Sequence, residues 1–247
     1  MRPIEIGNAT LYHGDCLEIL PTLTRCSSFC AKGEACSVTP DGRCLADGMA
    51  AITDPPYGIS FGHSVSRKNR KSSLARDYGK AQDRGWMDVE GDDRSFDPSP
   101  WLSFRQVVLW GGNHFADKLP ASPSWLVWDK RNGSVSDNHS DCEMAWTNLG
   151  GPARLYRHLW RGVVRAGEDN CANSPKYHPC QKPIELMRWV VSKTTGVVVD
   201  GYMGSGTTGV ACMNLGRSFV GIELNKQYFD IACERIENAQ RQVRMFA

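Results

Sequence analysis

The stretch "VVVDGYMGSGTTGV", residues 197–210, joins an apolar run, an acid, a glycine-rich turn and two threonines. The valines predict a buried strand that ends at Asp200, and the residues after the last glycine of the turn predict a helix. Glycines let the backbone approach a ligand closely, and the N-terminus of the helix presents unpaired N–H groups. The stretch therefore predicts a strand, a turn and a helix that bind a nucleoside.

The acids around this turn strengthen that prediction. Gly204, Gly206 and Gly209 have the spacing of the dinucleotide-binding pattern, and Glu223 ends the next predicted strand, where it can accept hydrogen bonds from a ribose. No Gly-Lys-Ser/Thr sequence follows, which argues against a Walker A phosphate loop. Alternatively, the stretch is an ordinary tight turn that needs glycine only for its backbone angles. That interpretation does not explain the acids at Asp200 and Glu223.

Strand and helix patterns alternate along the rest of the chain. Apolar runs predict strands at 9–15, 49–54, 105–112, 124–130, 141–147, 153–160, 197–200 and 218–224. Helices are predicted at 16–23 with a stop near Pro21, and at 182–196, 207–216 and 226–242. This alternation implies an α/β fold with one doubly wound, mostly parallel sheet and helices on both of its faces. We predict a single domain over residues 1–247.

Composition restricts the class of protein. The chain has 247 residues, of which 41% are hydrophobic, so it can bury a substantial core. No run approaches the roughly 18 apolar residues of a membrane span, and the N-terminus lacks the apolar centre of a signal peptide. We expect a cytoplasmic protein with no membrane partner. The net charge of +2 argues neither for nor against a polyanionic partner.

Basic residues gather in a long polar segment, residues 58–100. Its central part contains Arg67, Lys68, Arg70, Lys71 and Arg76, followed by Lys80 and Arg84. Taken alone, this run is typical of a solvated surface loop.

A second unusual segment, residues 24–47, is rich in cysteine. It contains four of the ten cysteines, Cys26, Cys30, Cys36 and Cys44, and few apolar residues that could order it. Four thiolates around one zinc ion would supply that order. Their spacings are looser than the paired C-x2-C of common zinc folds, so a surface insertion with free thiols is an equal alternative.

The sequence "TDPPYG", residues 53–58, places a carboxylate and an aromatic ring on a stiff backbone. Two prolines, whose φ angles are fixed, would also produce an ordinary rigid surface turn. The motif therefore carries chemistry only in combination with the glycine-rich turn.

In that combination the sequence resembles the S-adenosylmethionine-dependent amino-methyltransferases of DNA, which modify adenine N6 or cytosine N4. Their cofactor loop reads Asp-Pro-Phe-x-Gly-Ser-Gly-Thr-Thr, and residues 200–208 match it with Gly201 for Pro and Tyr202 for Phe. The segments "HGDCLEIL" (13–20), "DPPY" (54–57), "LWGGNHF" (109–115) and "HPCQKPIELM" (178–187) resemble further family motifs in the same order. This order resembles the permuted subgroup called β, and "LVWDK" followed by "CEMAWT" resembles phage and prophage members.

The resemblance implies a Rossmann-like methyltransferase fold and names the site. Asp54, Pro55, Pro56 and Tyr57 would be catalytic, and S-adenosylmethionine would bind at Asp15, Cys16, Lys182, Asp200, Tyr202, Gly204, Ser205, Gly206, Thr207, Thr208 and Glu223. The partner would be double-stranded DNA, in a bacterial or phage-infected cell. Segment 58–100, with Arg67, Lys68, Arg70, Lys71 and Arg76, would contact its phosphates. Segment 133–177 would read a target of a few base pairs.

The chemistry fits these residues. An anionic Asp54 and the carbonyl of Pro55 can accept the hydrogens of an exocyclic amine, and Tyr57 offers a face on which a flipped base can stack. The DPPY form leans toward adenine as a family tendency, with cytosine N4 as the alternative. Two other classes stay open: a methyltransferase acting on RNA or protein glutamine, and a non-enzymatic zinc-dependent DNA-binding protein.

Overall fold

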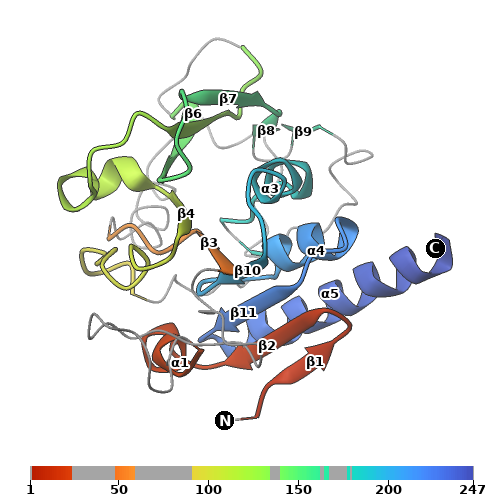
Figure 1. Cartoon of the computed structure of the whole chain (residues 1–247). Coiled ribbons are helices and arrows are strands. Elements are labelled where there is room, and N and C mark those ends of the chain that lie inside the picture. Colours follow the sequence, from red (N-terminus) through yellow and green to blue (C-terminus); the bar gives the residue numbers. More distant parts are fainter. Residues whose placement is uncertain are drawn as a thin grey trace, which may run out of the picture.

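Figure 1 shows a computed structural model of the chain, which describes residues 2–23, 48–58, 91–133, 140–161, 164–166, 177–178 and 180–246. Two predicted features lie outside these residues. They are the cysteine cluster (Cys26, Cys30, Cys36 and Cys44) and the basic cluster (Arg67, Lys68, Arg70, Lys71 and Arg76). In the described part, no helix is both long and apolar enough to cross a membrane.

A nine-stranded sheet organises the molecule, and its five central strands are parallel. In spatial order these strands are β2 (Ala9–His13), β11 (Phe219–Glu223), β10 (Val197–Asp200), β3 (Met49–Thr53) and β4 (Gln106–Trp110). β10 and β11, near the end of the chain, therefore lie between β2 and β3, near its start (Figure 1). The predicted α/β fold with a doubly wound, mostly parallel sheet is confirmed.

The strands at the two margins are not all parallel. β1 (Ile4–Ile6) runs antiparallel to β2, and β6 (Cys142–Thr147) runs antiparallel to both β4 and β5 (Trp125–Asp129). β7 (Arg154–Arg157) closes that margin parallel to β5. The strand predicted at 153–160 is in fact divided, because its end belongs to a separate hairpin of β8 (Trp160–Arg161) and β9 (Val164–Arg165).

The described helices are α1 (Cys16–Leu23), α3 (Ile184–Val191), α4 (Thr207–Asn214) and α5 (Lys226–Phe246), with short 3-10 turns at Gly112–His114 and Ala116–Lys118. α1 spans the predicted 16–23 and includes Pro21 in its last turn. The hydrogen bond that a proline lacks would reach back to Leu17, which is 53% exposed, so water can satisfy that carbonyl. α3 is shorter than the predicted 182–196.

Alternating side chains divide the core into two layers. Ile52, Val108 and Val198 face one side, where α3, α4 and α5 pack. Ala51 and Val199 face the other side, which is covered by α1 and by buried aromatic residues that include Phe96, Trp101 and Phe104. Both faces are covered, as the alternation predicted, but part of the second cover is irregular chain in place of helix. The central strands, buried on both faces, are accordingly continuous apolar runs.

Arg217 explains why α3 ends early. Its guanidinium donates hydrogen bonds to the carbonyl oxygens of Val191, Thr194 and Gly196, at distances of 3.3, 2.8 and 3.0 Å. These carbonyls lie where a continued helix would have used them internally. Arg217 thus stabilises the turn between α3 and β10, and through it the start of the strand that carries the glycine-rich turn.

Replacing Arg217 with methionine should therefore destabilise the fold. Hydrogen bonds to charged groups contribute about 1.5–3 kcal/mol each, so Arg217→Met is expected to lower the free energy of unfolding by about 2–3 kcal/mol after partial rehydration of the carbonyls. Urea unfolding followed by tryptophan fluorescence measures this. Arg241→Met, which removes an exposed ion pair with Glu237, is the matched control and should cost less than about 1 kcal/mol. Equal effects of the two variants would contradict the assignment.

Candidate functional site

Four acids gather at one edge of the sheet because four neighbouring parallel strands end there. Glu223 and Asp200 are the last residues of β11 and β10, Asp54 directly follows β3, and Asp15 lies two residues after β2. The order β2-β11-β10-β3 places these ends side by side. Ligands of open α/β sheets bind at this carboxyl edge. The sequence predicted all four acids as site residues, and the sheet brings them together.

Asp200 is buried beneath the glycine-rich turn and binds three protein donors. The hydroxyls of Thr53 and Thr208 donate to its two carboxylate oxygens at 2.7 and 2.6 Å, and the backbone N–H of Tyr202 donates at 3.1 Å. Burial raises the pKa of Asp200 to about 6, although the two threonine hydroxyls and the Tyr202 N–H oppose the rise. Its carboxylate therefore joins the end of β3 to the turn and to the start of α4.

The turn itself needs glycine because neighbouring groups crowd it. Gly206 has a φ of 80°, and a side chain there would place its Cβ 2.9 Å from the Cβ of Ala232. A Cβ at Gly201 would lie 2.1 Å from the indole of Trp101, a fully buried residue. The indole thus explains why glycine stands at position 201 in place of the family proline.

Glu223 binds the turn from the adjacent strand. One of its carboxylate oxygens accepts the N–H of Gly204 and the other accepts the N–H of Asn225, both at 2.8 Å. A carboxylate oxygen can accept more than one hydrogen bond, so these two bonds do not by themselves prevent Glu223 from binding a ligand hydroxyl.

Arg235 of α5 holds the other side of the turn. It donates to the carbonyl and hydroxyl oxygens of Ser205 and, at 3.4 Å, to the hydroxyl of Thr207. Its guanidinium also lies 4.9 Å from the ring centre of Tyr177, next to the "HPCQKP" segment. The predicted ligand residues Ser205 and Thr207 are buried and bonded within the protein. No local motif marks Arg235, so sequence reasoning missed it.

Asp15 and Cys16 lie at the N-terminus of α1. Asp15 accepts the backbone N–H of Leu17 at 2.8 Å and so caps that helix. Burial raises the pKa of the Cys16 thiol to about 11, which keeps it neutral. Tyr202 lies close by, its ring 5.9 Å from that of Trp101 and 6.0 Å from that of Phe96. The predicted residues Asp15, Cys16 and Tyr202 therefore line one part of the same edge.

Asp54 is held by two side chains. The hydroxyl of Tyr57 donates to one carboxylate oxygen and the ammonium of Lys182 to the other, both at 2.5 Å. Lys182 also pairs with Glu143 of β6 at 3.0 Å, and Glu143 pairs with Lys130 at 3.2 Å. The prediction assigned Lys182 to the cofactor, whereas the structure places its ammonium on Asp54. Lys130 and Glu143 lie in the segments "LVWDK" and "CEMAWT", for which the sequence suggested a resemblance but no role, and they were not predicted as site residues.

The charges of this cluster stabilise one another. Burial lowers the pKa of Lys182, but Asp54 and Glu143 outweigh burial and hold it well above its ordinary value. Burial likewise raises the pKa of Glu143, yet Lys182 and Lys130 bring it below its ordinary value. The pKa of Tyr57 is raised by burial and by Asp54, so its hydroxyl stays a donor.

Tyr57 carries the aromatic surface of the site. Its ring stacks on the imidazole of His114 with the ring centres 4.9 Å apart. Gly111 makes room for this ring, because a Cβ at that position would lie 2.0 Å from it. His114 lies in the "LWGGNHF" segment, for which the sequence suggested no role.

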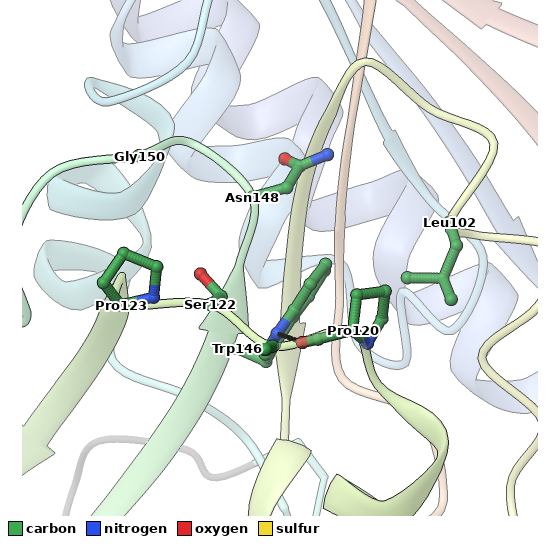
Figure 2. Close-up of a pocket in the computed structure, with 8 residues that line it drawn as sticks. Leu102, Pro120, Ser122, Pro123, Trp146, Asn148 and Gly150 are labelled. Carbon is green, nitrogen blue, oxygen red and sulfur yellow. Dashed lines mark hydrogen bonds between the residues drawn. The ribbon is translucent and has the colours of Figure 1, made fainter.

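Figure 2 shows a hollow of about 320 Å³ at a different place. It is lined by Leu102, Pro120, Ser122, Pro123, Trp146 and Asn148. Asn148 binds the N–H of Val107 near the start of β4, whereas Asp54 lies at the ends of the parallel strands. The hollow therefore belongs to the opposite edge of the sheet, away from the four acids.

Metal binding finds no support in the described residues, where no three His, Cys, Asp or Glu side chains are grouped to hold an ion. The zinc prediction concerns Cys26, Cys30, Cys36 and Cys44, which lie outside those residues. It stays a prediction.

Comparison with known proteins identifies relatives. Residues 123–234 match the N6_N4_Mtase family model, described as DNA methylase. The type II methyltransferase M2.LlaDCHI of Lactococcus lactis subsp. cremoris is 29% identical over 118 residues, which span 47% of this chain and 42% of that protein. The type II methyltransferase M.ScaI of Streptomyces caespitosus is 24% identical over 94% of this chain and 83% of its own length.

The fold has solved counterparts. The crystal structure of the M1.HpyAVI–SAM complex matches with a TM-score of 0.50 and 20% identity, covering 92% of this chain and 98% of that one. The similarity in fold therefore includes residues outside 123–234, the segment that the family model matches.

The raised pKa of Asp200 predicts how the free energy of unfolding depends on pH. Because its folded pKa of about 6 exceeds the ordinary 3.8, protonation stabilises the folded state; this contribution is complete below about pH 4 and is lost as pH rises through about 6. The difference in unfolding free energy between wild type and Asp200→Asn should therefore fall by about 1–3 kcal/mol from about pH 4.5 to about pH 7.5. Urea unfolding of both proteins measures it. A difference that is constant, or that rises with pH, would contradict the burial of this carboxyl.

Proposed function

We propose that the chain, whose residues 123–234 match the DNA methylase family model, transfers a methyl group from S-adenosylmethionine to an exocyclic base amine at a specific site in double-stranded DNA. One observation carries the proposal. Thr53, next to Asp54, donates to Asp200 at 2.7 Å, so the DPPY carboxylate and the glycine-rich turn share one buried connection. An acceptor for an amine and a turn suited to a nucleoside therefore lie on adjacent strands.

The residues at the carboxyl edge fit the cofactor. Glu223 holds the turn and would accept the ribose hydroxyls, Asp15 would contact the adenine of the cofactor, and Tyr202 would pack near its methionine. The crystal structure of M1.HpyAVI, which has a similar fold, is of its complex with SAM. When bound, S-adenosylmethionine supplies a methyl group already activated by its sulfonium.

The task left to the protein is to position a weak nucleophile. The lone pair of an exocyclic amine is delocalised into its ring, and hydrogen bonds from the amine to Asp54 and to the carbonyl of Pro55 favour a nitrogen whose lone pair is available. As the new N–C bond forms, the bond between the methyl group and the sulfonium would break and leave a neutral thioether, while the nitrogen becomes positive and must lose a proton. Asp54 is the anionic acceptor that the motif offers for it. The fixed φ angles of Pro55 and Pro56 keep the carbonyl in place.

The base must leave the duplex before its amine can react, because pairing and stacking otherwise bury it. Tyr57 presents an aromatic ring beside Asp54, and His114 extends that surface. Stacking of a base on an aromatic side chain contributes about 1–3 kcal/mol, enough to offset part of the cost of extrusion.

DNA contacts are proposed for two segments. Residues 58–100, with Arg67, Lys68, Arg70, Lys71 and Arg76, would neutralise phosphates next to the active site. Segment 133–177 would read the target, and its described part includes β7 at the margin of the sheet, with Arg154 and Arg157 exposed. The segment is short, which favours a target of a few base pairs.

Adenine N6 is the proposed target, since the motif is DPPY. Cytosine N4 is the second candidate, because the matching family model covers N6 and N4 enzymes and both bases present an exocyclic amine that Asp54 could hold.

Nucleoside analysis tests the function. DNA incubated with the purified protein and S-adenosylmethionine is digested to nucleosides, and N6-methyladenine is the expected product. Detection of N4-methylcytosine would support methyl transfer to an exocyclic amine but would show that the target base is cytosine. Neither product, on DNA of mixed sequence, would contradict the function.

Asp54→Ala tests the catalytic assignment. Loss of the amine acceptor should reduce methyl transfer by about 10³-fold or more. Affinity for S-adenosylmethionine should change by less than about threefold, which is about 0.7 kcal/mol, because the cofactor edge keeps Glu223 and the turn. Single-turnover transfer and calorimetry measure the two quantities. Asp230→Ala, which removes an exposed partner of Lys226, is the control, and transfer by Asp54→Ala at the rate of this control would sink the assignment.

A further inference from the structure

Four side chains of alternating charge form three successive ion pairs, and the last pair includes the proposed catalytic carboxylate, Asp54. Lys130 pairs with Glu143 at 3.2 Å, Glu143 with Lys182 at 3.0 Å, and Lys182 with Asp54 at 2.5 Å. They come from separate parts of the fold: the end of β5, the strand β6, the segment before α3 and the end of β3. We call these four residues the charge ladder.

Lys182 is the most enclosed member of the ladder. Its side chain is 9% exposed, against 21% for Asp54 and 28% for Glu143. The ring of Trp110, a fully buried residue, lies 5.5 Å from the ammonium. A buried ammonium is stable only with partners, and here the two carboxylates are those partners.

Glu143 determines how strongly Lys182 acts on Asp54. With two carboxylates in reach, the lysine divides its hydrogen bonds and charge between them. Without the Glu143 carboxylate, Lys182 would donate its hydrogen bonds to Asp54 alone. A carboxylate fully engaged by an ammonium is a weaker acceptor for an incoming amine. Glu143 also limits the positions of the flexible lysine stem, and so the orientation of the Asp54 oxygen that it binds.

We propose that Glu143 is a positioning residue for methyl transfer: it holds Lys182 between two carboxylates, so that Asp54 stays correctly oriented and free enough to accept the substrate amine. This inference rests on the proposed function. It assigns a role to Glu143 and moves Lys182 from the cofactor to the acceptor side of the site. Lys130, at the far end of the ladder, pairs with the Glu143 carboxylate oxygen that Lys182 does not bind.

The test separates positioning from cofactor binding. In Glu143→Gln the shape is kept and the charge is lost, so single-turnover methyl transfer at saturating S-adenosylmethionine and DNA should fall by about 10–100-fold. The dissociation constant for S-adenosylmethionine should change by less than about twofold. Glu143→Asp, which restores the charge on a shorter stem, should recover part of the rate. A residue that only stabilised the fold would not give this split or this recovery.

Glu185→Gln is the matched control. Glu185 pairs with Arg188 on α3 with its side chain 52% exposed, close in sequence to Lys182 but outside the ladder. Its transfer rate and cofactor affinity should equal those of wild type.

The remaining outcomes separate failure of this inference from failure of the proposed function. Glu143→Gln transferring at the wild-type rate overturns the inference and leaves the proposed function intact. Weakened cofactor binding in Glu143→Gln also overturns it, because Lys182 would then serve the cofactor. A wild-type protein without transfer overturns the proposed function and this inference together. Should Glu143→Gln fail to fold, Lys130→Gln and Glu143→Asp decide: slower transfer at unchanged cofactor affinity supports positioning, and wild-type rates in both refute it.

Discussion

The buried carboxylate of Asp200 is the connection on which the site depends. Its hydrogen bonds to Thr53, Thr208 and the N–H of Tyr202 join the end of β3, the glycine-rich turn and the start of α4 at distances of 2.6–3.1 Å. A carboxylate buried at this depth is costly unless donors surround it. Those donors come from the elements that carry the proposed amine acceptor and the proposed cofactor edge, so the same bonds that stabilise the charge set the spacing between the two halves of the candidate site.

Most polar groups of the site already have partners within the protein. Glu223 binds two backbone N–H groups, Asp15 caps α1, and Asp54 binds Tyr57 and Lys182. Ligands must therefore use the remaining acceptor positions of these carboxylates or displace one donor. An arrangement of this kind keeps side chains in place before the ligand arrives, which reduces the ordering cost of binding. The charge ladder extends the same principle to the acceptor carboxylate.

Motifs were predictable where chemistry depends on residues close together in the chain. Asp54–Tyr57 and Gly204–Thr208 could be recognised because a short stretch contains both the reactive groups and the stiff or permissive backbone that holds them. Glu143 and Arg235 could not be recognised this way. Glu143 lies within a strand and Arg235 within a long helix, and no neighbouring residue in the sequence indicates what either side chain binds. Their partners Lys182 and Ser205 are distant in sequence and meet them only in the folded sheet.

The sequence by itself determined the alternation of strands and helices, the acids at the strand ends and the glycines of the turn, because each follows from local periodicity and backbone sterics. Only the tertiary structure decided that Asp200 lies beneath the turn, that Lys182 pairs with Asp54, and that Arg217 binds the carbonyl of Val191 at the end of α3. Each of these depends on burial, since a charged group that loses water must bind whichever partners the fold brings within reach. Which partners those are is set by the order of strands in the sheet, and that order is a property of long-range pairing.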